Sequence, residues 1–306
     1  MSSMQLGRHA GTAAAGITVV LWAAAFVGIR AAGEDLSAGP LTLGRLLVAA
    51  AALGLFVAVR GDALPPRRDV PRLVLCGLLW FGAYNVMLNA AEQDIDAGTA
   101  AMLVNVGPVF LAVLAGLLLH EGFPRSLVVG CAIAFAGAIV IGLATSQRGV
   151  DASWGAALCV AAAAAYAGGV VAQKPLLERT SGLQVTFLAC LVGMLACLPF
   201  APPLVDELGD ASGTAIAWTV FLGVGPTAIG FSTWAYALAR TSAGKLGATT
   251  YLVPPLTILM GWAVLDETPP LLAFAGGALC LVGVAVTRGL ILGRRRAPAE
   301  AAVQRG

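Results

Sequence analysis

The sequence predicts an all-α, polytopic membrane protein with ten transmembrane helices, arranged as two inverted five-helix repeats. Its 306 residues are 59% hydrophobic and 11% charged, and their mean hydropathy is +0.88, outside the usual range of soluble domains. Apolar runs of about 20 residues, the length that crosses roughly 30 Å of hydrocarbon, recur along the whole chain. The later half of the chain also repeats the pattern of the earlier half.

Ten apolar runs are long enough to be spans. They cover 12–30, 38–59, 70–91, 98–119, 125–144, 153–175, 182–200, 213–239, 244–265 and 270–292. The runs lack the alternating pattern of a membrane barrel, and a backbone in lipid must satisfy its own hydrogen bonds, so helices are the remaining choice. Residues 8–27 also resemble a secretory signal peptide. We interpret them as the first span, because removing them would break the repeat and no soluble mature domain follows.

The charges predict the orientation, which depends on where Lys and Arg lie among short loops. If both termini are cytoplasmic, fifteen of the eighteen basic residues lie on the cytoplasmic side. They are Arg8, Arg60, Arg67, Arg68, Arg72, Arg125, Lys174, Arg179, Arg240, Lys245, Arg288, Arg294, Arg295, Arg296 and Arg305. The outer loops are acidic instead. We therefore expect a bacterial cytoplasmic (inner) membrane protein whose basic tail, 293–306, touches lipid headgroups and no nucleic acid.

The internal repeat is visible without gaps. A shift of 146 positions aligns 73–142 with 219–288. It pairs Gly77 with Gly223, Pro108 with Pro254, Glu121 with Glu267, Gly130 with Gly276 and Gly137 with Gly283. A shift of 144 pairs Trp22 with Tyr166, Arg30 with Lys174, Ser37 with Ser181 and Thr42 with Thr186. This divides the chain into repeats at 1–147 and 148–292 and the tail at 293–306. Because five is odd, the second copy enters the membrane inverted, an arrangement typical of secondary transporters.

The segment ALARTSAGKLGATTYLVPPLTILMGWAVLDETPP, 237–270, resembles the repeat of the EamA family in the drug/metabolite transporter superfamily. GTAAMLVNVGPVFLAVLAGLLLHEGF, 98–123, resembles it equally, as do LWAAAFVGIR and PLTLGRLL in the first two helices. The resemblance implies a carrier in which helices one to four and six to nine surround a central cavity, with helices five and ten peripheral. Many bacterial members export amino acids or related metabolites.

The third helix presents Phe81, Asn85, Asn89 and Glu92 on one face. Because polar groups facing lipid are costly, this face should look inward and line the cavity. Hydrogen bonding between helices is the alternative for the two asparagines. Glu92, at the outer mouth, is interpreted as a solvated end charge.

Symmetric pairs supply further candidates. Asn105 and Tyr251 precede their motif prolines at equivalent positions and would face each other across the pseudo-two-fold, and Trp22 and Tyr166 form an equivalent aromatic pair. Ordinary helix packing is the alternative for both pairs. Trp234 is a weaker candidate from the eighth helix.

Arg45 stands about two turns inside the outer end of the second helix. An arginine within the membrane predicts a functional site, here one that binds a carboxylate. Snorkelling to the outer surface, or pairing with Glu92, are the alternatives.

Two other repeated features predict structural roles. Glu121 and Glu267 each precede a helix and are expected to accept hydrogen bonds from its free N–H groups. Gly130, Gly137, Gly276 and Gly283 form small-residue faces on the fifth and tenth helices, which predict either packing within the chain or a homodimer.

The sequence predicts no cofactor, metal or nucleic acid. The six cysteines have no metal-ligand spacing, and no phosphate-binding loop occurs. The leading hypothesis is an exporter of small metabolites, foremost amino acids, that works by alternating access. Broad-specificity drug export and a membrane-embedded enzyme are the alternatives, and an enzyme would need an acid/base or metal set that no span carries. With no acid predicted deep in a helix, uniport or exchange is favoured over proton coupling.

Overall fold

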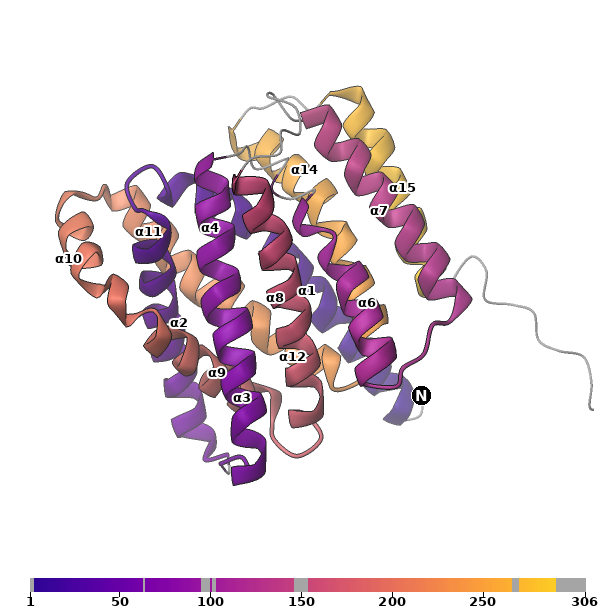
Figure 1. Ribbon diagram of the computed structural model, residues 1–306, viewed down its shortest axis with the longest axis horizontal. Coiled ribbons are helices and arrows are strands. Elements are labelled where there is room, and N and C mark those ends of the chain that lie inside the picture. The colour runs from indigo at the N-terminus through magenta and orange to yellow at the C-terminus, as the bar shows by residue number, and fades with distance from the viewer. Residues whose placement is uncertain are drawn as a thin grey trace, which may run out of the picture.

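The computed structural model describes residues 3–62, 64–94, 100, 103–145, 154–265 and 270–289, and every regular element in these ranges is a helix (Figure 1). The elements are α1 (Ser3–Ala32), α2 (Ala38–Arg60), η1 (Arg67–Asp69), α3 (Val70–Cys76), η2 (Gly77–Ala83), α4 (Tyr84–Asp94), α6 (Gly107–Leu118), α7 (Arg125–Thr145), α8 (Trp154–Leu176), α9 (Gly182–Ala196), η3 (Leu198–Phe200), α10 (Ala201–Asp210), α11 (Gly213–Leu222), η4 (Gly223–Gly230), α12 (Phe231–Leu238), α13 (Ala243–Gly247), η5 (Ala248–Leu252), α14 (Val253–Leu265) and α15 (Leu271–Thr287).

Five helical stretches in the described part are long and apolar enough to cross a membrane. They are His9–Ala32, Ala38–Arg60, Arg67–Asp94, Trp154–Leu176 and Gly213–Leu238. The pair Gly182–Ala196 and Leu198–Asp210 makes a sixth if the bend of 54° between them is counted as one span. Shorter apolar helices cover Gly107–Leu118, Arg125–Ile141 and Leu271–Thr287. The all-α membrane class is therefore confirmed, while the count of ten spans stays a prediction.

Two helices differ from those expected. The apolar run 98–119 predicts one helix, but the chain turns at 105–106 and α6 begins at Gly107, directly before Pro108. The residues after 200 are expected to form a loop, but they form α10, with proline in the first turn, where a missing N–H costs no hydrogen bond. Both α6 and α10 have proline in their first turn, and hydropathy alone does not reveal where such helices begin.

Two π-helical segments, η2 and η4, interrupt the long stretches 67–94 and 213–238 at positions equivalent under the 146-residue shift. Each begins with a glycine pressed against a neighbouring helix. A Cβ on Gly77 would lie 2.6 Å from the Ala189 carbonyl oxygen, and one on Gly223 would lie 2.8 Å from that of Arg45. Arg45 and Ala189 are themselves equivalent under the 144-residue shift. Equivalent residues of the two halves therefore make equivalent contacts across α2–η4 and α9–η2.

The glycine faces of α7 and α15 pack on each other within the chain, at one side of the bundle (Figure 1). A Cβ on Gly130 would lie 2.6 Å from the Gly283 carbonyl oxygen, and one on Gly137 would lie 2.6 Å from that of Gly276. The glycines thus allow close backbone approach in one molecule. A homodimer through these helices stays a prediction and would use their outer faces.

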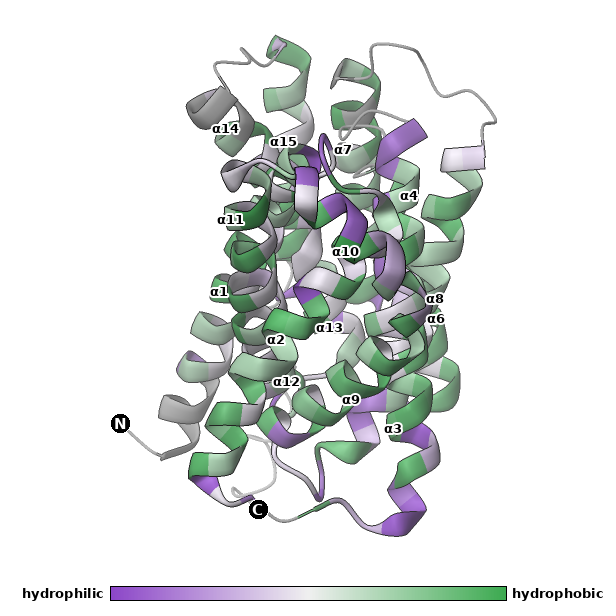
Figure 2. Cartoon of the chain, turned by 90° about the vertical axis from the view of Figure 1, so that its left-hand side faces the viewer, coloured by the Kyte–Doolittle hydropathy of each residue, from purple (hydrophilic) through white to green (hydrophobic). Residues whose placement is uncertain are grey.

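Charged residues gather at the two ends of the bundle, with hydrophobic residues between them (Figure 2). We call one end the acidic end, defined by Glu34, Asp35, Asp94, Asp206, Glu207 and Asp210. We call the other the basic end, defined by Arg60, Arg67, Arg68, Arg72, Arg179, Arg240 and Lys245.

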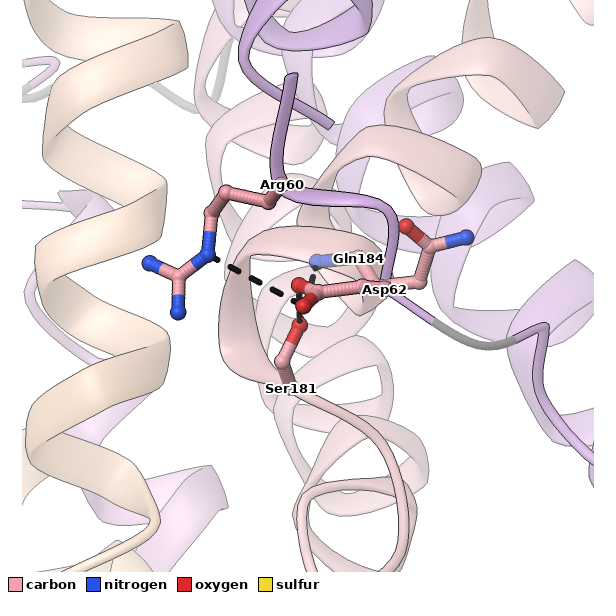
Figure 3. Close-up of polar contacts among 4 residues, drawn as sticks. All are labelled: Arg60, Asp62, Ser181 and Gln184. Atoms are coloured by element: carbon pink, nitrogen blue, oxygen red, sulfur yellow. Dashed lines mark hydrogen bonds and ion pairs between the residues drawn. The ribbon is translucent and has the colours of Figure 1, made fainter. Parts of the chain in front are cut away.

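A polar contact joins the two halves at each end. At the acidic end, Ser37 donates to Glu207 from its backbone N–H (2.8 Å) and from its hydroxyl (2.5 Å). At the basic end, the Ser181 hydroxyl donates to Asp62 (2.6 Å), which also lies 3.8 Å from Arg60 (Figure 3). We call these contacts the acidic-end clasp and the basic-end clasp. Because Ser37 and Ser181 are repeat equivalents that begin α2 and α9, the two clasps are built alike.

Glu121 caps a helix, but a different one from the helix expected. Its carboxylate accepts hydrogen bonds from the N–H groups of Ala243 (2.7 Å) and Gly244 (3.1 Å), at the start of α13 in the other half. His120 (φ 55°) and Gly122 (φ 69°) adopt left-handed conformations beside Glu121, where the chain turns before α7. The prediction that Glu121 caps the helix following it in sequence is therefore wrong. Glu267 lies outside the described residues.

Candidate functional site

A cavity of about 70 Å³ lies among helices of both halves. This exceeds the roughly 10–15 Å³ that a cavity needs to hold one water molecule. Its lining residues are Trp22, Ala25, Phe26, Ile29, Arg45, Trp80, Tyr84, Asn85, Leu88, Val104, Asn105, Pro108, Tyr166, Phe231, Thr250 and Val253. The cavity therefore has room for a ligand group, and its lining combines polar and apolar side chains.

Arg45 forms the charged wall of this cavity and is only 3% exposed. Its Nε and Nη2 atoms donate to the Thr227 hydroxyl, at 3.2 and 3.0 Å. Thr227 lies in the π-helical η4 and donates in turn to the Leu222 carbonyl (2.7 Å). A guanidinium has five N–H donors. Because both of its hydrogen bonds in the described part of the chain go to one hydroxyl, Arg45 keeps donors for an anionic ligand.

The second π-helical segment supports the neighbouring wall. The Asn85 side-chain amide donates to the carbonyl oxygens of Trp80 (3.1 Å) and Phe81 (2.9 Å) in η2. A π-turn disturbs the regular helical hydrogen bonds, and such turns are frequent at functional sites. The Asn85 side chain therefore supplies hydrogen bonds to two carbonyl oxygens of this π-turn, and Asn85 also lines the cavity.

Aromatic rings close the cavity on the side of the basic end. Trp80 and Phe81 precede Asn85 in a helix that runs toward the acidic end, and Phe231 and Trp234 follow Thr227 in a helix that runs toward the basic end. Ring centroids lie 4.7 Å apart for Trp80 and Phe231 and 4.5 Å apart for Phe81 and Phe231.

Trp22 and Tyr166 extend this aromatic layer. The Trp22 ring stacks on Trp234 at 4.9 Å, and its Nε1 donates to the Pro226 carbonyl (3.3 Å). The Tyr166 ring lies 5.6 Å from Trp80, and its buried hydroxyl makes no hydrogen bond within the described chain, although Thr250 lies beside it. The layer separates the cavity from the basic end.

The structure brings five of the nine predicted site residues to the cavity: Trp22, Arg45, Asn85, Asn105 and Tyr166. Their binding of a substrate stays a prediction. Phe81, Asn89, Trp234 and Tyr251 are buried but do not line the cavity.

Each of these four packs between elements instead. The Asn89 side-chain amide donates to the Thr42 hydroxyl on α2 (2.9 Å), which is the alternative weighed for the asparagines. Phe81 and Trp234 belong to the aromatic layer. Tyr251 packs with residues of α7 and α15, so it does not face Asn105 across the cavity.

Among the cavity residues that sequence reasoning missed, Trp80, Tyr84, Phe231 and Thr250 carry aromatic rings or hydroxyl groups that a substrate could contact. Thr250 replaces its neighbour Tyr251, because η5 is a 3₁₀-helix and turns about 120° per residue, which changes the residues that face inward. Trp80 and Tyr84 each lie one residue before a member of the predicted face, Phe81 and Asn85, so widening that face by one position would have found them.

Glu92 differs from its expected environment. It was interpreted as a solvated end charge, but both carboxylate oxygens are buried and make no hydrogen bond within the described residues. Glu92 lies in the last turn of α4, where α1, α2 and α8 pack around the helix and exclude solvent.

Among the described residues, no group of three His, Cys, Asp or Glu side chains could hold a metal ion. All six cysteines are free and buried, as expected of small packing residues.

Comparison with known proteins identifies relatives along nearly the whole chain. A probable terminal-alkyne amino-acid exporter of Streptantibioticus cattleyicolor is 41% identical over 283 residues, which cover 92% of this chain and 94% of the relative. A probable amino-acid metabolite efflux pump of Salmonella typhimurium is 25% identical, with 88% and 91% covered. One solved structure, 20% identical, superposes with a TM-score of 0.75 over 92% of this chain and 98% of its own, which supports the fold alone.

The family model described as the EamA-like transporter family matches twice, at residues 9–143 and 153–289. The cavity described above draws its lining from both matched segments. This chain belongs to the EamA-like transporter family, and it is a membrane protein of the transporter class.

Proposed function

We propose that this chain exports small amino acids or related zwitterionic metabolites across the bacterial cytoplasmic membrane by alternating access. The observation that carries the proposal is Arg45, a buried guanidinium with unused donors on the wall of the cavity. Planar N–H pairs bind carboxylates with two hydrogen bonds. The rings of Trp22, Trp80 and Phe231 offer an apolar surface for the rest of the substrate. The names of the two amino-acid-exporting relatives support this substrate class.

Alternating access requires two halves that rock about the cavity, and we propose that these are two inverted five-helix repeats. The equivalent contacts of Gly77 and Gly223, and the two clasps built from Ser37 and Ser181, support this symmetry. The excess of Lys and Arg at the basic end supports a cytoplasmic location for that end and for both termini. In this arrangement, the aromatic layer lies between the cavity and the cytoplasm.

The polar groups of the cavity are distributed unequally between the halves. Arg45, Asn85 and Asn105 of the first half correspond to Ala189, Phe231 and Tyr251 of the second. The carboxylate and amino groups of a substrate would therefore lie toward the acidic end, with its side chain against the aromatic layer. The rocking of two halves does not require polar groups to be distributed unequally between them. We therefore attribute the unequal distribution to recognition of the substrate.

Counterflow in proteoliposomes tests the proposal. Purified protein in vesicles preloaded with one unlabelled amino acid should accumulate the same labelled amino acid transiently, across at least part of a panel of the twenty. A broad drug exporter would instead prefer lipophilic compounds from a second panel. Absence of counterflow with every amino acid would contradict the proposal.

The role of Arg45 is tested with Arg45→Gln and two forms of the best substrate. A charge-assisted hydrogen bond contributes about 1.5–3 kcal/mol, so the variant should lose roughly tenfold to a hundredfold in affinity for the amino acid. It should lose little for the corresponding amino-acid amide, which lacks the carboxylate. Arg240→Gln, at an exposed arginine of the basic end, is the matched control. Equal losses for both ligands in Arg45→Gln would remove Arg45 from carboxylate recognition.

A further inference from the structure

Glu92 is a buried acid that the proposed substrate site leaves unused. Both of its carboxylate oxygens are shielded from solvent and make no hydrogen bond within the described part of the chain. It lies one turn beyond the cavity residue Leu88, toward the acidic end. Burying an ionised carboxylate without hydrogen bonds is costly, so such a group either faces a cation or takes up a proton.

The groups around Glu92 come from every helix packed against it. Arg45 of α2 and Arg30 of α1 are the cations whose charges act on its carboxylate. Tyr84 lies on the same helix, and Cys159 faces it from α8, while η2 contributes no titratable residue. Arginine keeps its charge at every physiological pH. Among the charged groups of this cluster, the carboxylate of Glu92 is therefore the one suited to exchange a proton.

Arg45 and Glu92 together match the two charges of a zwitterion. Arg45 donates only to Thr227 in the described chain, and Glu92 accepts from nothing there, so neither group is held by the other through a hydrogen bond. An α-amino acid carries its carboxylate and ammonium on one carbon. A substrate held by Arg45 through its carboxylate would bring its ammonium to the neighbourhood of Glu92.

We propose that the substrate ammonium and a proton compete for Glu92, and that this competition couples export to the entry of one proton. The inference rests on the proposed amino-acid export. With the cavity open to the cytoplasm, Glu92 releases its proton to water and the resulting carboxylate binds the substrate ammonium. With the cavity open to the outside, a proton from that side neutralises the carboxylate and the ammonium is released. One proton enters for each zwitterion exported, no other bond forms or breaks, and one positive charge moves inward.

This inference replaces the expectation of uniport or simple exchange. That expectation depended on finding no acid deep in a helix, and the burial of Glu92 removes its basis. The second half carries Leu238 at the equivalent position, so this position supplies an acid in the first half alone. The proposed cycle accordingly uses one proton for each substrate.

The direct test measures protons released on substrate binding. In detergent and weak buffer between about pH 6 and 9, the amino acid that gave counterflow should release protons from the wild-type protein at some pH in this range. Glu92→Gln should release none, and Asp94→Asn should behave as wild type because Asp94 is exposed on the same helix. Gel filtration and thermal unfolding establish that each variant is folded. Wild-type protein that binds the amino acid without releasing protons across this range would overturn the proposal.

A second test separates failure of coupling from failure of transport. In proteoliposomes, an imposed pH gradient should drive accumulation of the labelled amino acid by wild type, at least tenfold above its level without the gradient. Glu92→Asp should keep this response, and Glu92→Gln should lose it. Wild-type counterflow without any response to the pH gradient would contradict the proton coupling and leave amino-acid export standing. Undiminished gradient-driven accumulation by Glu92→Gln would also contradict it.

Discussion

Asn105 and Tyr251 hold equivalent positions in the two repeats, and only Asn105 reaches the cavity. Asn105 lies in the turn directly before α6, whereas Tyr251 lies in the 3₁₀-helix η5 and packs toward α7 and α15. Equivalence in sequence therefore does not give equivalence of environment. The local helix type decides which neighbouring residue faces the substrate.

This difference predicts that a substitution at Asn105 slows transport and that a substitution at Tyr251 does not. Asn105→Ala should lower the rate of amino-acid counterflow about twofold to tenfold, by losing a hydrogen bond worth about 0.5–1.5 kcal/mol near the substrate. Tyr251→Phe should leave counterflow unchanged, because its hydroxyl is buried away from the cavity and makes no hydrogen bond in the described chain. Flux in proteoliposomes, normalised to folded protein, checks both. A larger loss from Tyr251→Phe than from Asn105→Ala would reverse this assignment.

At the scale of single residues, the sequence predicted groups whose environment follows from helix periodicity. Arg45 and Asn85 project inward because polar groups on a membrane helix avoid lipid, and both line the cavity. The burial of Glu92 was not predictable, because three other helices create it and no local pattern reports their position. Glu121 was rightly expected to cap a helix, but its partner α13 is distant in sequence.

At the scale of elements, close packing of α7 on α15 depends on their glycines. A Cβ on Gly137 would lie 2.6 Å from the Gly276 carbonyl oxygen, a backbone atom that cannot rotate away. Gly16, in α1, has no atom within 4 Å of its Cβ position. Alanine substitutions at Gly137 and Gly16 therefore form a matched pair. They test whether glycine is needed at Gly137 because of the contact between helices.

Gly137→Ala should destabilise the protein by about 1–3 kcal/mol, the usual cost of overpacking. Gly16→Ala should be neutral or stabilise by about 1 kcal/mol, since alanine favours helix. Thermal unfolding in detergent, followed by circular dichroism, compares the two variants with wild type. If Gly137→Ala melts at the wild-type temperature, the α7–α15 contact is looser than described.

Helix type was less predictable than helix position. Hydropathy located the long stretches from Arg67 to Asp94 and from Gly213 to Leu238 but gave no sign of the π-turns inside them. Those turns form where Gly77 and Gly223 press against a neighbouring backbone. The contact is tertiary, and a glycine alone does not predict it.

At the scale of the whole molecule, the two clasps join the halves at opposite ends of the bundle, and the aromatic layer lies on the basic-end side of the cavity. Each clasp joins the two halves through one serine and one carboxylate. Under the proposed alternating access, the basic-end clasp would open for entry of a substrate and the acidic-end clasp for its release. We therefore expect the two clasps to open in turn.

The most direct test of alternating access measures whether one cavity residue can be reached from each side of the membrane. The native cysteines are all buried, so a single Ala25→Cys on the cavity wall offers a distinct thiol, with wild-type protein as the background. In oriented vesicles, a membrane-impermeant thiol reagent should reach Cys at this position from either side, and a transported amino acid should slow labelling from both. Labelling from one side alone, with and without substrate, would contradict alternating access.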